Sequence, residues 1–395
     1  MADFADCFSA LDFSHHSRVV VAISGGSDST GLLVFLREYL KFKKPAPELV
    51  AVTIDHGLRA ESANEAVRVW SLCEKLGVVH LTTPWEGEKP KTGIQAAARE
   101  ARYRLLMQAA HENDATLILT GHTEDDQFET VFMRGERGEG PGLAGIAPAT
   151  LAFGEHAPVW FARPFLTVTR AAIRGQLNRR GMEWIDDPSN DNSDYERVRV
   201  RQSLTSSLES DLAQLRQTQL EWAKKRADLS QRAARLMNRH VSEVSRGLFL
   251  ISPALKDEVD AEAAAETLRI CLAFAGGSEK MIETQSAADI VTLLESGEFF
   301  RKTGTGALMD RRRQGLFVLR ENRNPGKMSE IAPAQAKFPK DVPASLARRA
   351  LATVPSDRRR LYPWPVRVPL FNLAAASALA QLVGFEAFPP PPCSL

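Results

Sequence analysis

Six consecutive small or acidic residues give this chain its clearest chemical signal: Ser24, Gly25, Gly26, Ser27, Asp28 and Ser29. An apolar strand is expected just before them, over 18–23, and a helix just after them, over 30–40. Glycine lets a backbone turn tightly and approach a ligand, while the N–H groups and positive dipole of a helix start attract anions. A glycine turn with an ordinary helix cap would use the same residue types. The complete string at a strand-to-helix junction favours a nucleotide phosphate site.

Asp28 places a carboxylate where phosphates are expected. The two charges would repel each other unless a divalent cation lay between them, so Asp28 predicts bound Mg²⁺. The chain has no GxxxxGK[ST] loop, and it therefore lacks the lysine that reaches the terminal phosphates in Walker-type enzymes. This favours reaction at the α-phosphate of ATP, with pyrophosphate leaving as a unit.

A second group of ionisable residues follows the strand expected at 116–120. At helical spacing, part of this group shares one face: His122, Asp125 or Asp126, and Glu129. Like charges at such spacing cost about 0.2–0.5 kcal/mol per pair, and a cationic substrate would offset that cost. Acidic residues also favour the first turn of any helix because of its dipole. The pattern nevertheless predicts a site for a cationic group.

Further polar residues lie near the expected strand ends. Asp55 and His56 terminate a strand, which favours a position at the rim of the sheet rather than in the core. Arg59, Arg99 and Arg102 could bind phosphate, since guanidinium groups contact phosphate oxygens bidentately, or they could be solvated helix residues. We therefore expect Asp55, His56, Arg59 and Arg102 to be possible phosphate or substrate contacts.

Arginines also mark two segments that could contact RNA. Gly135–Gly145 holds five glycines around Arg137 and is expected to be a mobile loop that closes on substrate or RNA, with a plain surface loop as the alternative. Arg197, Arg199 and Arg201 alternate along a later segment and are further candidates. The Arg311–Arg313 run, in contrast, is typical of a solvated hairpin tip.

The elements that must position these residues alternate along the first half of the chain. Short apolar runs at 18–23, 49–54, 78–83 and 116–120 are expected to be buried strands, each followed by a helical pattern or a loop leading to one. Strands separated by helices predict a parallel sheet with right-handed crossovers. The expected fold class is therefore a doubly wound α/β domain. Ligands of such sheets bind beyond the carboxyl ends of the strands, where the residues above fall.

From about residue 204 the pattern changes to long amphipathic segments at 208–241 and 260–275. A hairpin is expected at 304–320, around a polar turn at 310–315, and the last 70 residues are rich in proline without a clear fold. We therefore expect three parts: a catalytic domain over 1–205, a helical domain ending in a hairpin over 206–322, and a basic C-terminal region over 323–395.

Charge and cysteine usage narrow the function. The net charge of +1 is unevenly distributed, because the C-terminal residues 301–395 carry 16 Lys and Arg against 6 Asp and Glu. A basic module behind an acidic catalytic domain is what a polyanion-binding enzyme would contain, although many basic tails have no such partner. The four cysteines lie far apart without a CxxC pair, which argues against a zinc ribbon, an iron–sulfur cluster or a disulfide scaffold. No leader or membrane span is visible, so a cytoplasmic location is expected.

The string at 24–29 resembles the PP-loop motif of the N-type ATP pyrophosphatases, which have an adenine nucleotide alpha hydrolase-like fold, adenylate a substrate and release pyrophosphate. Within them, the chain is similar to the tRNA(Ile)-lysidine synthetase family over roughly residues 16–205 and, loosely, to about residue 315. The segments that carry the resemblance are Asp55–Arg59, Ala98–Tyr103, Gly121–Thr130, Arg163–Phe165 and Asp187–Asn190.

This resemblance implies ATP and Mg²⁺ as cofactors, with L-lysine and the CAU-anticodon isoleucine tRNA as partners. It implies that Asp28, Asp126 and Glu129 are catalytic, that Asp126 and Glu129 face the amino acid, and it slightly favours Arg102 as a phosphate contact. The implied product is lysidine at the wobble position, which changes codon reading from AUG to AUA. The asparagine usual in the arginine-rich segment of the family is replaced here by Val198 or Glu196. Contact of that segment with RNA is therefore less secure.

Other readings remain. A PP-loop tRNA thiolase would usually need a cysteine pair or cluster, which the scattered cysteines do not supply. A glutamine-dependent synthetase would need a glutaminase domain, and none is visible. A catalytically silent nucleotide- and RNA-binding module is a third possibility, against which the intact Asp28, Asp126 and Glu129 argue.

Overall fold

The computed structural model divides the chain into two compact units, one formed by residues 1–224 with 389–395 and the other by residues 225–388. Each unit is described by itself below. The residues that the structure describes are 4–57, 62–90, 92–154, 156–186, 196–205, 208–278, 281–321, 342–353 and 367–395.

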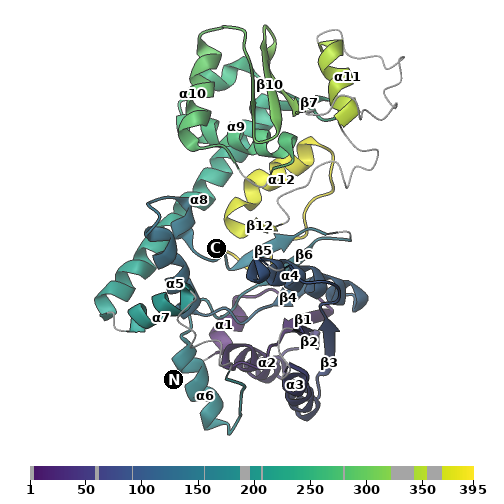
Figure 1. Cartoon of the computed structure of the whole chain (residues 1–395), viewed down its shortest axis with the longest axis vertical. Helices are drawn as coiled ribbons and strands as arrows, with labels where there is room; N and C mark the ends of the chain where they lie inside the picture. Colours follow the sequence, from purple (N-terminus) through teal and green to yellow (C-terminus); the bar gives the residue numbers. More distant parts are fainter. Residues whose placement is uncertain are drawn as a thin grey trace. The chain divides into compact units, whose positions relative to one another are not determined.

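The first unit is built on a mostly parallel sheet (Figure 1). Its strands lie in the order β5-β6-β4-β1-β2-β3. All neighbours in this order pair in parallel except β5, which runs antiparallel to β6. The four strands expected from the sequence are confirmed as β1 to β4, whereas β5 and β6 were not expected. The strands of this unit are β1 (Arg18–Ala22), β2 (Glu48–Asp55), β3 (Val79–Pro84), β4 (Leu117–Leu119), β5 (Ala149–Ala152) and β6 (Val159–Ala162).

Helices cover both faces of this sheet, as the doubly wound fold class predicts. Figure 1 shows α4 on one side of the strands and α2 with α3 on the other. Tyr103, Leu106 and Met107 of α4 pack on Val20 of β1 and Phe161 of β6 in one buried cluster. The helices of this unit are α1 (Ala5–Ser9), α2 (Ser27–Leu40), α3 (Ser62–Leu76), α4 (Ile94–Glu112), α5 (Glu124–Gly135), η1 (Pro141–Ala144), α6 (Arg170–Arg179), α7 (Glu196–Thr205) and the first half of α8 (Glu209–His240).

The connections of the sheet reverse direction at β1. From β1 the chain runs outward to β2 and β3 on one side, and it then returns to β4 on the other side of β1. Such a topological switch point opens a crevice beyond the carboxyl ends of the two central strands, and ligands bind there. The loop at 24–29 follows β1, and the segment from His122 follows β4. The fold therefore brings the two strongest sequence signals to the same crevice.

The second unit contains an antiparallel sheet in the order β7-β8-β11-β10-β9. The predicted hairpin is present as β10 and β11, while β7, β8 and β9 come from a part of the chain that we expected to be helical. The elements of this unit are the second half of α8, β7 (Val241–Ser245), β8 (Leu248–Ile251), η3 (Pro253–Asp257), α9 (Ala261–Gly276), α10 (Thr284–Glu295), β9 (Arg301–Gly304), β10 (Ala307–Arg312), β11 (Gly315–Arg320), α11 (Ala344–Thr353), β12 (Arg367–Pro369), η6 (Leu370–Asn372) and α12 (Leu373–Leu382).

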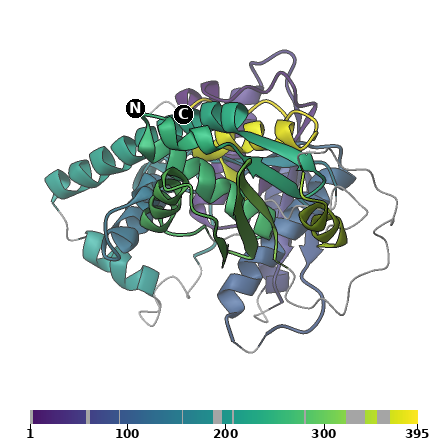
Figure 2. The same cartoon turned by 90° about the horizontal axis from the view of Figure 1, so that it is seen from above.

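Helices from distant parts of the sequence cover the two faces of this second sheet. Leu346 and Ala350 of α11 pack against Leu248 and Phe317 in one buried cluster. Phe249 points to the opposite face, since side chains alternate along a strand, and its ring lies 5.8 Å from that of Phe274 in α9. Figure 2 shows the strands between these helices. Part of the region after residue 323 is therefore folded into the core of this unit.

One detail of the predicted hairpin is wrong. We expected a polar turn over 310–315 with a solvated Arg311–Arg313 run, but Asp310 and Arg311 belong to β10 and are only 3% and 7% exposed. The carboxylate of Asp310 can be buried because Arg301 of β9 and Arg312 form ion pairs with it. The turn is confined to residues 313–314, between the paired Arg312 and Gly315. The prediction failed because the sequence did not reveal β9, whose Arg301 pairs with Asp310 and allows it to be buried.

Within the ranges given above, no helix is both long enough and apolar enough to cross a membrane.

Candidate active site

The predicted phosphate loop connects β1 to α2. Gly26 is the N-cap of α2, which begins at Ser27. The Ser29 hydroxyl donates a hydrogen bond to the Gly26 carbonyl at 3.2 Å and accepts one from the Ser24 amide at 3.1 Å, so the loop is closed on itself. Gly25 has a φ of +86°, which glycine adopts without strain. The structure thus places the six-residue string at a helix start, with the geometry of an anion site.

A short segment before residue 187 covers this loop. The Ile185 amide donates a hydrogen bond to the Gly25 carbonyl at 2.8 Å. A Cβ added at Gly25 would approach Cδ1 of Ile185 to 2.6 Å, so a larger residue there would also have to displace the end of the Ile185 side chain. Next to it, the indole of Trp184 donates to Asp186 at 3.1 Å. The Asp187–Asn190 motif that follows lies outside the described residues.

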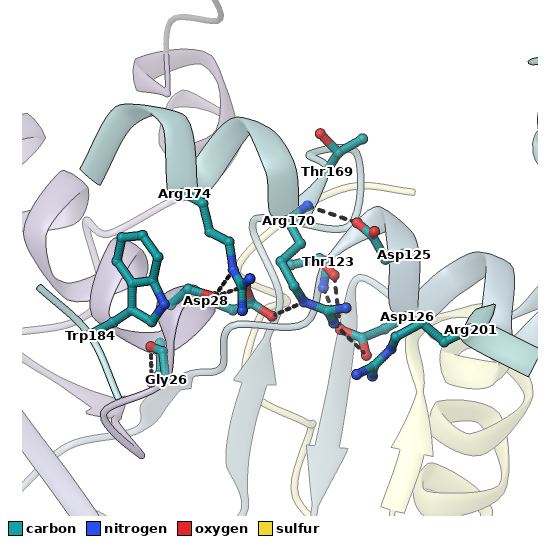
Figure 3. Close-up of polar contacts among 12 residues, drawn as sticks. Gly26, Asp28, Thr123, Asp125, Asp126, Thr169, Arg170, Arg174, Trp184 and Arg201 are labelled. Atoms are coloured by element: carbon teal, nitrogen blue, oxygen red, sulfur yellow. Dashed lines mark hydrogen bonds and ion pairs between the residues drawn. The ribbon is translucent and has the colours of Figure 1, made fainter. Parts of the chain in front are cut away.

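One arginine joins the phosphate loop to the acidic helix start, as Figure 3 shows. Nε of Arg170 lies 2.9 Å from Oδ2 of Asp28, and its Nη2 lies 3.6 Å from Oδ1 of Asp126. The backbone amide of Arg170 donates to Oδ2 of Asp125 at 2.7 Å. Thr169 caps this first turn of α6 by accepting from the Ala172 amide. Three of the predicted acids, Asp28, Asp125 and Asp126, therefore meet around the start of α6, which the sequence did not single out.

The charges in this cluster stabilise one another. Burial raises the pKa of Asp28, and Arg170 opposes that rise. Burial also works against a charge on Asp126, but the Thr123 amide and Arg170 help to keep the pKa of this carboxyl below its usual value. For Arg170 itself, burial is outweighed by Asp28 and Asp126, which raise the pKa of the guanidinium. The cluster is therefore a half-buried cation between half-buried carboxylates.

His122 lies on the same rim but carries no charge near neutral pH. Burial and the nearby Arg163 lower its pKa to about 3, against the opposing influence of Asp126. Its Nδ1 is 2.9 Å from the Thr120 hydroxyl, which fixes the ring. A neutral, fixed imidazole can donate or accept a hydrogen bond at the site, but it is a weak base.

Glu129, the third residue predicted to be catalytic, is buried in α5 and forms ion pairs with arginines of α7. Nε of Arg201 lies 2.8 Å from its Oε1, and Nε of Arg197 lies 3.2 Å from its Oε2. Between these arginines, Val198 is buried while Arg199 is exposed. The valine that departs from the family pattern thus faces the protein interior. Two of the arginines that we predicted to contact tRNA contact Glu129 in this structure.

The remaining rim residues lie at the end of β2. The Asp55 carboxylate accepts from the Gly57 amide at 2.8 Å. The His56 ring lies perpendicular to Trp85 with centroids 5.8 Å apart. Burial and then the charge of Arg102 lower the pKa of His56, so Arg102 reaches this end of the sheet. Arg59 lies outside the described residues, and its role stays a prediction.

The glycine-rich loop after α5 is tied down in this structure. Arg134 donates to the carbonyls of Gly142 and Gly145 at 2.7 and 3.0 Å. The Gln127 side chain exchanges two hydrogen bonds with the backbone of Ile146. The expected mobility of this loop stays a prediction, and Arg137 lies on it as an exposed side chain.

The carboxylates of the site suit a metal ion that is bound together with a phosphate ligand. Among the described residues, no group of three or more His, Cys, Asp or Glu side chains gathers to bind a metal alone. Mg²⁺ in nucleotide sites commonly takes one or two carboxylates together with phosphate oxygens and water. Asp28 and Asp126, which contact the same guanidinium, provide such a pair. The residues therefore fit a Mg²⁺ ion that is bound together with ATP.

Sequence reasoning missed Arg170 and Arg174, which project from α6 toward the loop. Nε of Arg174 donates to the Ser27 hydroxyl at 3.2 Å. A signal for them does exist in the sequence. A cation is unfavourable in the first turn of a helix because of its dipole, so Arg170 at the first position of α6 indicates a nearby anion, and Arg174 lies on the same face one turn later.

Comparisons with known proteins agree with this geometry. The sequence profile of the PP-loop domain matches residues 3–208. The chain is 37% identical to a tRNA(Ile)-lysidine synthase of Mesorhizobium japonicum, over 98% of this chain and 96% of the relative. It is 52% identical to a protein of the same name from Brucella ovis over 197 residues, which are 49% of this chain and 43% of that relative.

Proposed function

The chain belongs to the tRNA(Ile)-lysidine synthase family, and we propose that it uses ATP to attach lysine to carbon 2 of the wobble cytidine in the CAU-anticodon isoleucine tRNA. One observation carries the proposal. At the switch point of the sheet, Asp28 of the phosphate loop lies close to Asp125 and Asp126 of α5, and all three contact Arg170. The site would act on a cytoplasmic RNA.

The first step is adenylation of the RNA. The phosphates of ATP lie on the loop at Ser24–Ser29, where the start of α2 and the serine hydroxyls donate hydrogen bonds. Oxygen 2 of the cytidine attacks the α-phosphate, and pyrophosphate leaves. Mg²⁺ bound at Asp28 would supply charge neutralisation for the phosphates. Adenylation converts an unreactive carbonyl oxygen into a leaving group, which explains why the reaction needs ATP.

The second step brings lysine to the adenylated base. Its ε-amine attacks carbon 2 and AMP departs with the former carbonyl oxygen. Free lysine carries an α-ammonium and an α-carboxylate, and the Glu129–Arg201 pair offers complementary charges for both. Asp126 adds a second carboxylate near the phosphate loop. Catalysis then comes mainly from positioning and from neutralising charge.

His122 is an unsuitable base for the amine proton. With a pKa of about 3, it holds a proton too weakly to remove one from an attacking ammonium group near neutral pH. We therefore assign it a hydrogen-bonding role toward the base or the phosphate. The amine proton goes to a carboxylate, to water or to the RNA.

A sulfur-transferring tRNA enzyme is the nearest alternative, and the cysteines argue against it. All four are free. Burial raises the pKa of Cys73 to about 11 and that of Cys271 to about 12, so neither thiol is a ready nucleophile.

ATP–pyrophosphate exchange tests the order of the steps. Purified protein should exchange labelled pyrophosphate into ATP when the isoleucine tRNA is present, with or without lysine, because the RNA is adenylated first. Exchange that needs lysine and not tRNA would show that the amino acid is adenylated instead, and it would overturn the proposed reaction.

A further inference from the structure

Helix α6 directs two arginines at two consecutive residues of the phosphate loop. Arg170 contacts the carboxylate of Asp28 at 2.9 Å, and Arg174 contacts the hydroxyl of Ser27 at 3.2 Å. Figure 3 shows both side chains reaching from the same helix toward the loop. Their spacing of four residues places them on one face of α6, one turn apart.

Placing these two guanidinium charges beside the loop has a cost in free energy, which a role in holding the fold together does not explain. Arg170 is the first residue of α6, where the helix dipole disfavours a cation. The side chain of Arg170 is only 18% exposed, so its charge has also lost most of its hydration. The contact of Arg174 with the loop is to a neutral hydroxyl, although its other end pairs with Asp186 at 2.9 Å. An anion bound on the loop would give Arg174 a charged partner there and would add a further anion beside Arg170.

The adenylation chemistry supplies such an anion. When oxygen 2 of the base forms its bond to the α-phosphorus, the bond from that phosphorus to the bridging oxygen breaks. The electron pair stays on the bridging oxygen, so negative charge grows on the leaving pyrophosphate and no proton is required. Donors placed at the position where charge develops lower the barrier. The loop has no Walker-type lysine for this purpose.

We propose that Arg170 and Arg174 form a clamp for the β- and γ-phosphates of ATP and for the pyrophosphate that leaves. The inference rests on the adenylation step of the proposed function. In this structure, Arg170 is held by Asp28 and Asp126, and Arg174 by Ser27 and Asp186. With nucleotide, each guanidinium turns to phosphate oxygens, and Asp28 is released from its arginine.

Calorimetric titration of the full chain with inorganic pyrophosphate tests the clamp. Arg174→Gln should weaken binding about tenfold or more, because it removes a hydrogen bond to a charged group. Arg170→Lys keeps the charge but loses the bidentate fork, and it should also weaken binding. Arg179→Gln is the matched control, since it removes the same charge from an exposed position on the same helix, and it should bind like the wild type.

Thermal unfolding checks that each variant is folded. Arg170→Gln could fail to fold because it leaves Asp28 and Asp126 without a cation, and in that case Arg174→Gln and Arg170→Lys carry the test. Unchanged pyrophosphate binding in these two folded variants would overturn the clamp. An equal loss in Arg179→Gln would overturn it as well, because net charge alone would then explain the effect.

A parallel assay for lysidine separates this inference from the proposed function. Lysidine formed by the wild type, together with unchanged pyrophosphate binding in the variants, would leave the function standing and remove the clamp. Weakened binding in the variants of a protein that forms no lysidine would support the clamp and remove the function.

Discussion

Nε of Arg201 lies 2.8 Å from Oε1 of Glu129, a carboxylate that is only 1% exposed and that we propose to act on lysine. A charge so deeply buried requires a partner, and α7 provides it. The pair joins the helix that carries the predicted catalytic acids to the segment predicted to contact RNA. Lysine binding and the position of α7 should therefore be coupled.

Replacing Glu129 by Gln should separate the two chemical steps. The amide keeps the size of the side chain but removes the charge that would face the lysine ammonium. The Michaelis constant for lysine should rise about tenfold or more, because the variant cannot make the charge-assisted hydrogen bond, while tRNA-dependent release of pyrophosphate persists. Steady-state kinetics of both steps provide the measurement. Loss of both steps in a folded protein would place Glu129 at the ATP site.

Replacing Asp28 by Asn should abolish adenylation without unfolding the protein. Gly26, and not Asp28, is the N-cap of α2, so an amide of the same size at residue 28 leaves the capped first turn of the helix unchanged. The charge that would hold Mg²⁺ and that now holds Arg170 is removed. Asp114→Asn, at an exposed carboxylate, is the control. AMP formation and Mn²⁺ binding should both fall in Asp28→Asn, and near wild-type values of either would contradict the metal role.

His122 should make the protein less stable in weak acid. Its folded-state pKa of about 3 lies below the ordinary histidine value of 6.5, so the unfolded chain takes up the proton first. The stabilisation from the neutral ring is complete above 6.5 and declines as the pH falls toward 3. The decline is at most about 1.4 kcal/mol per pH unit.

Urea unfolding at pH 7 and pH 5 measures this decline. His122→Gln cannot titrate, so its free energy of unfolding should change less between the two values than that of the wild type. Half-buried histidines such as His80, whose pKa burial also lowers, contribute to both proteins alike. Identical pH dependence in the two proteins would show that His122 is protonated normally in the folded state.

The basic C-terminal residues 301–395 should contact phosphates of the tRNA. Removing everything after residue 322 is a poor test, because Leu346 and Ala350 of α11 belong to the core of the second unit. Arg348, on the exposed side of α11, can instead be replaced together with Arg349.

In Arg348→Gln/Arg349→Gln, the plot of log affinity for tRNA against log salt should be less steep by about one for each phosphate that an arginine no longer neutralises. Lys41→Gln/Lys44→Gln removes the same charge from exposed positions of the first unit and should leave the slope unchanged. An unchanged slope in the arginine variant would assign these arginines to solubility or packing. Lys327, Lys337, Lys340 and Arg358–Arg360 carry further charge of this region but lie outside the described residues.

The sequence predicts the catalytic half well because its signals are local. The loop at 24–29 is recognisable from adjacent residues, and the strand that precedes each acidic segment is a continuous apolar run. Parallel strands bring their carboxyl ends together, so Asp28 and Asp126 could be expected at one crevice without any knowledge of their contacts.

The features that the sequence did not reveal depend on contacts between residues that lie far apart in the sequence. Arg170 meets Asp28 across 142 residues, and its role is visible only once α6 is placed beside α2. Asp310 looks like a turn residue until β9 places Arg301 against it. Val198 looks like a departure from the family pattern, yet it is a buried residue on the inner side of α7.

Nucleoside analysis of the wobble position tests the central claim most directly. The CAU-anticodon isoleucine tRNA, prepared without modifications, is incubated with ATP, labelled lysine and the protein, and its nucleosides are then separated by mass. The account predicts that the wobble cytidine gains one lysine and loses one water, in equal amount to the AMP released. Consumption of ATP without lysine in the RNA, or lysine at any other nucleotide, would contradict it.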